Sequence, residues 1–233
     1  MKNIEFRDIS IYLKKEKALV ISDMHLGFEE ALNKQGFLVP RFQFKETIER
    51  LRKIFKNIEI NEIVLNGDFK HEFGTISDTE WKDSLRMIDF LSENCKKLTI
   101  VKGNHDKIIG PIAIRRNIKP VLGYKLGDNY FCHGDLIPND FEFHEAKNII
   151  IGHEHPAISL RKIGRTETYK CFLVGKFKSK NLIVMPSFNL VVEGSDVLKE
   201  KMLSPFLKQG IKYFNVYVVG DKIYDFGKLK DLS

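Results

Sequence analysis

Five short polar motifs, each directly after a run of apolar residues, carry the side chains of this sequence best suited to chemistry. Two of their aspartates, one asparagine and four of their imidazoles are enough to hold two divalent metal ions, and a fifth imidazole is left over as a proton donor. One such motif would mean little, because a lone histidine beside an apolar strand is usually a core residue. The motifs are Asp23-Met24-His25, Gly67-Asp68-Phe69-Lys70-His71, Gly103-Asn104-His105-Asp106, His133-Gly134-Asp135 and Gly152-His153-Glu154-His155.

Five such motifs in series predict a two-metal site for phosphate esters. Two metals that act on one phosphate lie about 4 Å apart, and a carboxylate is the ligand that offers lone pairs to both. Asp68, which we expect at a strand end, is our choice for that bridge. Asp23 and His25 lie two residues apart, as do His153 and His155, so both members of each pair can turn inward where the strand ends.

The remaining predicted ligands are the amide oxygen of Asn104 and the imidazole of His133. Ligation rich in histidine and poor in carboxylates favours Mn²⁺, Fe, Zn or Ni over magnesium and calcium, which prefer oxygen. We therefore expect two divalent metal ions as cofactors, with Mn²⁺ as the first choice.

The apolar runs before these motifs are too short for helices. Continuous β-branched runs of this kind are typical of strands covered on both faces. Functional groups of open α/β sheets gather just beyond the carboxyl ends of the strands, so motifs far apart in sequence can meet at one edge. The runs cover residues 18–21, 63–65, 98–101, 130–132 and 149–151.

Helical patterns lie between these strands, and hairpin patterns follow Pro156. Phe44, Ile48, Leu51, Phe55 and Ile58 recur at helical spacing after Pro40. A capping box at 77–80 opens another helix, and a short one runs from near Phe28 to Gly36. Residues 169–174 and 182–185 predict one hairpin, and 213–219 and 222–226 predict a second. The sequence thus predicts an α/β fold with two facing sheets and helices outside.

Composition sets broad limits on the class of protein. The chain has 233 residues, 43% of them hydrophobic and 30% charged, which is ordinary for a globular protein. It has no apolar run long enough to span a bilayer, and charges stand where a signal peptide needs an apolar segment. Three widely spaced cysteines without a CxxC pair suit a reducing compartment. We predict a cytoplasmic protein with no membrane partner.

The net charge of +7 has two interpretations. It suits an acidic partner such as nucleic acid. Lys- and Glu-rich surfaces also suit proteins that work at high temperature. Charge alone does not decide between them.

The ordered set DxH, GDxxH, GNHD, HG and GHxH resembles the calcineurin-like metallophosphoesterase superfamily from Asp23 to His155. The resemblance implies a four-layered αββα sandwich of two mixed sheets flanked by helices. We expect one such domain over 1–233, with the metal-binding motifs at 23–155 and a strand-rich part at 157–233. The resemblance implies His105 as the general acid. It assigns one metal to Asp23, His25, Asp68 and His155, and the other to Asp68, Asn104, His133 and His153.

One position departs from the protein phosphatases of this superfamily, in which an aspartate three residues after the bridging one orients the catalytic histidine. Here that residue is His71. The GDxxH form looks like SbcD-type repair nucleases and DNA-ligase-associated phosphoesterases. The stretches SDMHLGFEEALNKQG, IIIGHEHPAISL and VMPSFN are similar to the ligase-associated group and its archaeal relatives. His71 is thus a candidate catalytic or positioning residue, with a structural role as the alternative.

Several neighbours of the predicted ligands are expected to do other work. Asp106 should brace the GNHD turn, while Glu154 and Asp135 should point away from the metals. Cys132 should lie in the core and His144 on the surface.

The predicted activity is hydrolysis of phosphodiester bonds. Two divalent ions, two carboxylates and a hydroxide leave one positive charge, which suits a singly charged diester better than a dianionic monoester. A nuclease acting on DNA or RNA is the first interpretation, and a phosphodiesterase or phosphatase for a small nucleotide is the alternative. A non-catalytic scaffold is a third, although no expected ligand is missing. The oligomeric state stays open.

Overall fold

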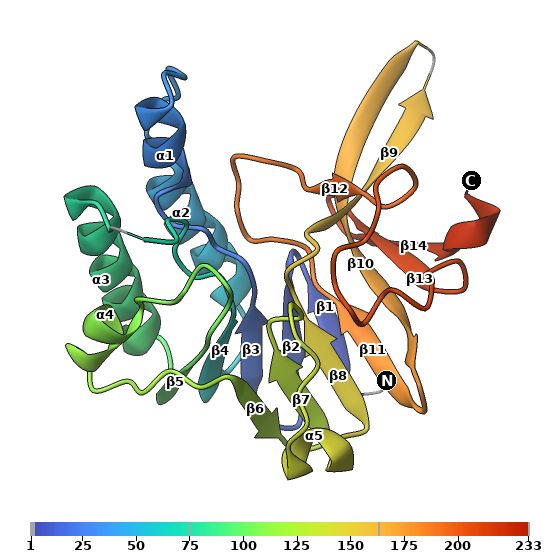
Figure 1. The fold of residues 1–233 in the computed structure, drawn as a ribbon, viewed down its shortest axis with the longest axis horizontal. Coiled ribbons are helices and arrows are strands. Elements are labelled where there is room, and N and C mark those ends of the chain that lie inside the picture. Colours follow the sequence, from blue (N-terminus) through green and yellow to red (C-terminus); the bar gives the residue numbers. More distant parts are fainter. Residues whose placement is uncertain (1–2, 75, 163, 233) are drawn as a thin grey trace.

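The computed structural model describes residues 3–74, 76–162 and 164–232. Its first sheet has the order β1-β2-β3-β4-β5. The first three strands pair antiparallel, and β3, β4 and β5 run parallel (Figure 1). The bounds are β1 (Ile4–Arg7), β2 (Ser10–Leu13), β3 (Ala18–Ile21), β4 (Glu62–Asn66) and β5 (Lys97–Val101).

The second sheet has the order β12-β9-β10-β11-β8-β7-β6, and β13 pairs with both β10 and β14. Parallel pairing joins β7 to β8 and β8 to β11. Both predicted hairpins are confirmed as the antiparallel pairs β10–β11 and β13–β14. The bounds are β6 (Gly123–Leu126), β7 (Asn129–Cys132), β8 (Asn148–Ile151), β9 (Pro156–Lys162), β10 (Arg165–Phe177), β11 (Lys180–Val184), β12 (Ser195–Asp196), β13 (Asn215–Val219) and β14 (Ile223–Lys228).

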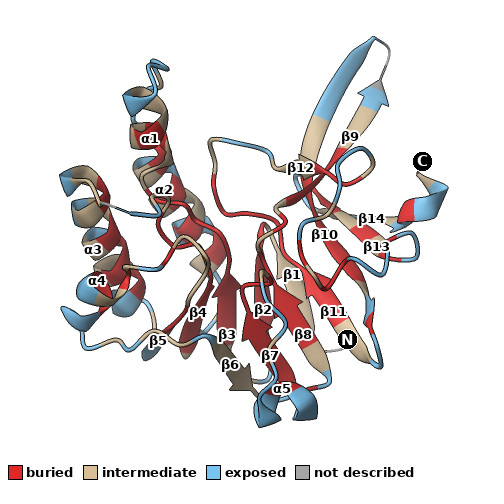
Figure 2. Cartoon of the chain, in the orientation of Figure 1, coloured by how far each residue is buried: buried red, intermediate tan, exposed pale blue. Residues whose placement is uncertain are grey.

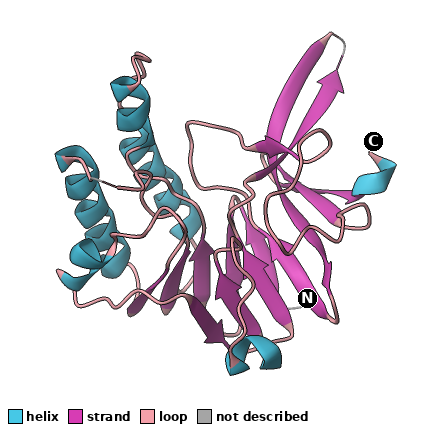
Figure 3. Cartoon of the chain, in the orientation of Figure 1, coloured by secondary structure: helices cyan, strands magenta, loops and turns pink. Residues whose placement is uncertain are grey.

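The predicted two-sheet α/β sandwich with helices outside is confirmed, with unequal outer layers (Figure 3). Beside the first sheet lie α1 (Phe28–Lys34), α2 (Gln43–Phe55), α3 (Asp78–Glu93) and α4 (Gly110–Ile114). Beside the second sheet the layer consists of α5 (Phe141–Glu145), the 3-10 helix η1 (Leu229–Asp231) and the segment 197–214. Phe206 and Phe214 of that segment are buried against the sheet, so side chains cover this face where long helices do not.

The strands β7 and β8 of the second sheet are buried along most of their length (Figure 2), and their side chains alternate between its two faces. On β7, Phe131 faces the core between the sheets, while Tyr130 and Cys132 face the outer layer. Cys132 is buried, as predicted. On β8, Ile150 faces inward while Ile149 and Ile151 face outward. The runs are apolar throughout because both faces are covered.

The helix predicted after Pro40 ends earlier than its apolar spacing suggested. It stops at Phe55, because Lys56 adopts an extended ψ of 134° and Asn57 a left-handed φ of 61°. Ile58 lies beyond this break, yet it still packs against the main core. The spacing of Ile58 therefore indicates that the residue packs against the core, and it does not indicate that the helix continues to this position. In the described part of the chain, the helices are all too short or too polar to cross a membrane.

The carboxyl ends of β3, β4, β5, β7 and β8 meet at the top of the sandwich in Figure 1. Each of these strands runs directly into one of the five polar motifs. The Asn66 side chain at the end of β4 donates to the Ile150 carbonyl of β8 at 3.2 Å, which ties the two sheets together below the motifs.

Candidate metal centre

The structure brings all seven predicted metal ligands together. Six of them fall into two groups whose donor atoms lie within 4.8 Å of one another, and Asn104 adjoins the second, with its Oδ1 2.8 Å from His133 Nε2. The groups are Asp23, His25 and His155, and Asp68, His133 and His153. A third group of this kind joins His25 to His71 and His105.

Asp68, a member of the second group, also faces the first. Its Oδ2 atom is 3.3 Å from His133 Nε2 and 3.7 Å from His25 Nε2, so one oxygen faces an imidazole of each group. Asp23 lies deeper, with Oδ1 3.5 Å from both His155 Nε2 and His133 Nδ1. The position of the Asp68 carboxylate, with an imidazole of each group beside it, is the geometry that a shared carboxylate ligand requires.

The donor set fits divalent metal ions. Donor atoms that share one cation at about 2.1 Å lie about 3 Å apart. His133 Nε2 is 3.0 Å from His153 Nδ1, and His25 Nε2 is 3.1 Å from His155 Nε2. The imidazole nitrogens and carboxylate oxygens thus lie close together, with lone pairs that can bind one cation. Such a convergence calls for a cation, and its nitrogen content favours a transition metal.

The buried carboxylates and imidazoles of the centre shift one another's pKa values. Burial alone would raise the pKa of Asp23, but the imidazoles of His155, His133 and His25 hold it well below its usual range. Burial and the neighbouring His155 lower the pKa of His25 to about 3. Burial would also lower the pKa of His133, but the bond to Asp68 and the charge of Asp23 raise it to about 9. In the metal-free protein, a proton on His133 therefore offsets part of the aspartate charge.

The backbone at the centre turns sharply. Five of the seven predicted ligands have a left-handed φ between 45° and 69°, a region that costs a residue with a side chain about 1–2 kcal/mol. His153 is held there because its N–H lies 3.1 Å and 3.2 Å from the two carboxylate oxygens of Asp23. The five are Asp23, His25, Asp68, His153 and His155.

His105 lies over the second motif. Its Nδ1 donates to the His71 carbonyl oxygen, and its Nε2 is 3.8 Å from Asp68 Oδ2. The backbone carbonyl of His71 thus holds the His105 ring, while the His71 side chain contacts other residues. His71 Nδ1 lies 3.4 Å from His25 Nδ1, and its ring packs edge-on against Phe28. Burial and the neighbouring His105 lower the pKa of His71 to about 4.

The expectations for three neighbouring residues, Asp106, Glu154 and His144, are confirmed. Asp106 accepts from the backbone N–H of Gly103 at 3.0 Å, so it braces the GNHD turn. Glu154 accepts from the backbone N–H of Ser204, away from the predicted metal positions. His144 lies at the surface, bonded to the side chain of Asn139, while Asp135 lines a cavity of about 680 Å³ together with His133.

Three residues that support the first metal-binding motif are not recognisable from the sequence, because they lie outside that motif along the chain. The Gln43 amide donates to the carbonyls of Met24 and His25 at 3.2 Å and 3.1 Å. Ser187 Oγ and Asn189 N donate to the Asp23 carbonyl at 2.7 Å and 3.1 Å. The VMPSFN stretch, which was singled out by resemblance alone, thus holds the first metal-binding loop.

Two further residues join the loops after β4 and β5. Lys70 is fully buried, and its ammonium donates to the carbonyls of Glu72 and, at 2.7 Å, His105. Glu80 accepts from the N–H groups of His71 and Glu72, both at 3.0 Å. The predicted capping box is only half formed, since Ser77 accepts from Glu80 N while the Glu80 carboxylate turns to the loop.

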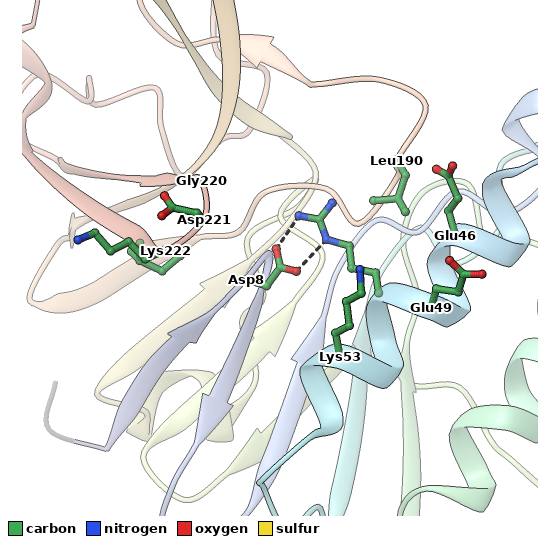
Figure 4. Close-up of a pocket in the computed structure, with 10 residues that line it drawn as sticks. Asp8, Glu46, Glu49, Lys53, Leu190, Gly220, Asp221 and Lys222 are labelled. Carbon is green, nitrogen blue, oxygen red and sulfur yellow. Dashed lines mark hydrogen bonds and ion pairs between the residues drawn. The ribbon is translucent and has the colours of Figure 1, made fainter.

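A cavity of about 500 Å³ opens over the centre and is lined by His25, Asp68, Asn104, His105 and His153 among others. A larger cavity of about 700 Å³ lies between α2 and the β13–β14 turn (Figure 4). The Arg50–Asp8 ion pair crosses it at 2.8 Å, and none of the predicted site residues lines it. The predicted catalytic residue His105 therefore lines the smaller of these two cavities.

Comparison with known proteins agrees with this geometry. The family model for calcineurin-like phosphoesterases matches residues 16–194. The nuclease MPE of Pseudomonas putida is similar in structure, with 19% identity, a TM-score of 0.66, and coverage of 95% of this chain and 93% of that chain. A search of curated protein sequences gives no significant match.

Two solved structures with lower TM-scores are also similar. The phosphoesterase Yfce of E. coli has 11% identity, a TM-score of 0.44, and coverage of 91% of this chain and 97% of that chain. The Zn²⁺ complex of Vps29 from Entamoeba histolytica has 15% identity, a TM-score of 0.39, and coverage of 90% and 99%. With the family model matched over more than half of its length, the chain belongs to the calcineurin-like phosphoesterase family and is a metal-dependent phosphoesterase.

Proposed function

We propose that this protein is a two-metal phosphodiesterase that cleaves nucleic acid, with Asp68 as the ligand shared by both ions. The position of Asp68 Oδ2 between the two donor groups is the observation that carries the proposal. Asp23, His25 and His155 complete one site, and Asn104, His133 and His153 complete the other. Mn²⁺ is the proposed metal, and Fe, Zn or Ni would suit the same nitrogen-rich donors.

When bound, two such ions would activate water and neutralise charge on the phosphate. His105 acts as the general acid in this proposal. Because its Nδ1–H is held by the His71 carbonyl, its Nε2 is the nitrogen left to act, and the imidazolium form of the ring passes its Nε2 proton to the leaving oxygen and becomes neutral. The His71 ring, whose low pKa keeps it neutral at pH 7, packs beside His25 and His105 and positions the ester.

Two observations support nucleic acid as the substrate. The fold is similar to that of a bacterial nuclease along nearly the whole chain, and the net charge of +7 suits a polyanion. A phosphodiesterase or phosphatase for a small nucleotide is the second candidate. The volume of the cavity, about 500 Å³, favours it, since small-ligand pockets have this size.

The same proposal includes a single domain over 1–233 and a cytoplasmic location. The described cysteines, Cys95, Cys132 and Cys171, are all free thiols, which suits a reducing compartment.

Loading the purified protein with Mn²⁺ tests the function. Metal analysis should approach about two equivalents per chain. The loaded protein should hydrolyse bis-p-nitrophenyl phosphate and single-stranded DNA faster than p-nitrophenyl phosphate. Asp68→Asn should bind less than one equivalent and lose activity, since both ions lose a ligand. A plateau at one equivalent with full diesterase activity would rule out the two-metal proposal, and a preference for the monoester would favour the phosphatase.

A further inference from the structure

One wall of the metal cavity comes from a part of the chain beyond the family match. The family model ends at residue 194, and the segment 195–204 follows it. Ser195, Glu200, Lys201 and Leu203 of this segment line the cavity together with His105 and His155. The side chains of this segment can therefore influence which substrate binds without any change in the metal ligands.

The segment is fixed at both ends to the metal-binding loops. At its start, Ser195 N donates to the His155 carbonyl at 2.9 Å. At its end, Ser204 N donates to the Glu154 carboxylate, and Ser204 Oγ donates to the Gly134 carbonyl at 2.6 Å. Side chains of 195–204 thus keep a defined position relative to the loops that carry His133, His153 and His155.

The charged residues of the segment divide into anchors and one cation at the cavity. Lys199 Nζ pairs with Asp196 Oδ2 at 2.7 Å, and Glu200 Oε1 accepts from Asp196 N at 2.8 Å. Lys201 has no carboxylate within 4.0 Å among the residues that the structure describes, and it lines the cavity. Its ammonium is positioned to meet an anion that enters from solvent.

Exposed apolar side chains lie in the wall of this cavity and against His105. Leu203, in the cavity wall, is 71% exposed. Phe73 is 51% exposed, and its ring centroid lies 3.6 Å from that of His105. Aromatic and apolar surfaces beside a cation are the features that bind single-stranded nucleic acid, through base stacking and phosphate contact.

We propose that Lys201 binds the phosphate next to the scissile one, with Leu203 and Phe73 against the flanking bases. This inference rests on the proposed function and narrows it to single-stranded polynucleotides. A substrate with one phosphate would occupy the metal centre and leave Lys201 without a partner.

Salt dependence of binding tests the contact directly. The ligand is a fluorescent, phosphorothioate-linked oligothymidylate, which keeps its charges and resists cleavage, and the protein carries Mn²⁺. Loss of one phosphate contact lowers the slope of log K against log salt concentration by about 0.7 for a single strand. Lys201→Gln should show this decrease, Lys201→Arg should restore the slope, and the control Lys199→Gln should keep it.

Cleavage gives the second measurement. In Lys201→Gln the ratio of the rate on single-stranded DNA to that on bis-p-nitrophenyl phosphate should fall, and in Lys199→Gln it should not. If Lys201→Gln keeps both the slope and the ratio, or if the wild-type protein does not bind the oligonucleotide, the inference is wrong. Hydrolysis of bis-p-nitrophenyl phosphate by the wild type would still support the two-metal phosphodiesterase in that case, and cleavage of double-stranded nucleic acid would still support a nuclease.

Discussion

At the scale of single residues, His105 and His71 share a task that the sequence motif assigns to side chains alone. The His71 carbonyl fixes the Nδ1–H of His105, so a substitution of the His71 side chain leaves that contact in place. The side chain of His71 acts separately, through its packing beside His25 and Phe28. The two contributions can be separated by mutation.

His105→Asn should keep both metals and lower turnover by about 100-fold on esters with poor leaving groups, because general acids contribute at least this much. The loss should be much smaller with p-nitrophenolate, which leaves without a proton. His71→Ala keeps the carbonyl, so it should lower the ratio of bis-p-nitrophenyl phosphate to p-nitrophenyl phosphate hydrolysis without this leaving-group dependence. Rates on a leaving-group series and metal analysis of both variants provide the measurement.

Equal losses for His105→Asn on good and poor leaving groups would exclude it as the acid. An unchanged ratio and rate in His71→Ala would make the His71 side chain structural.

At the scale of elements, the first turn of α3 is tied to the loop after β4. The Glu80 carboxylate accepts the N–H groups of both His71 and Glu72, and burial raises its own pKa. Through the His71 carbonyl, this contact reaches His105. A helix on the outside of the sandwich thus fixes the direction of a group in the cavity.

Glu80→Ala should lower the free energy of unfolding by about 2 kcal/mol, since two half-buried N–H groups lose their acceptor. It should also lower turnover most on poor leaving groups, because His105 loses its fixed orientation. Glu80→Gln, which keeps one acceptor oxygen, should lie between it and the wild type. Glu93→Ala, at the exposed other end of α3, is the control. Loss of stability with an unchanged leaving-group series would limit Glu80 to a structural role.

Glu80 also shows where sequence reasoning stops. The pattern at 77–80 predicted the helix start correctly, because capping is a local interaction. It assigned the Glu80 side chain to the cap, since the sequence does not show that a loop with open N–H groups lies beside it. Gln43 and Ser187 were missed for the same reason, as they act on residues far along the chain. The ligand motifs were recognisable because each combines a strand end with its own polar residues.

At the scale of the whole molecule, Lys170 places a charge within the sandwich. It lies on β10, is 7% exposed, and donates to the Val192 carbonyl at 2.8 Å. Burial lowers its pKa to about 8, although Glu193 opposes the shift. The unfolded chain, with the ordinary value of 10.5, therefore binds more protons between pH 8 and 10.5. Stability from this group rises with pH in that window, by about 3 kcal/mol in total.

Lys170→Met removes this dependence. The free energy of unfolding of the variant minus that of the wild type should be largest below pH 8 and should fall as the pH rises toward 10.5. Urea unfolding at pH 7, 8, 9 and 10 gives the comparison. Lys176→Met, at an exposed position of the same strand, should show a constant difference. A constant difference for Lys170→Met as well would mean that its ammonium is not desolvated in the native state.

The left-handed backbone at five of the predicted ligands places catalytic turnover and thermal stability in conflict. At such positions glycine is the residue that relieves the backbone, yet glycine has no side chain to bind a metal. The protein therefore keeps carboxylates and imidazoles at positions where glycine would make the metal-free fold more stable. Replacing His153 or His155 by glycine should therefore raise the stability of the metal-free protein while it removes one predicted metal ligand.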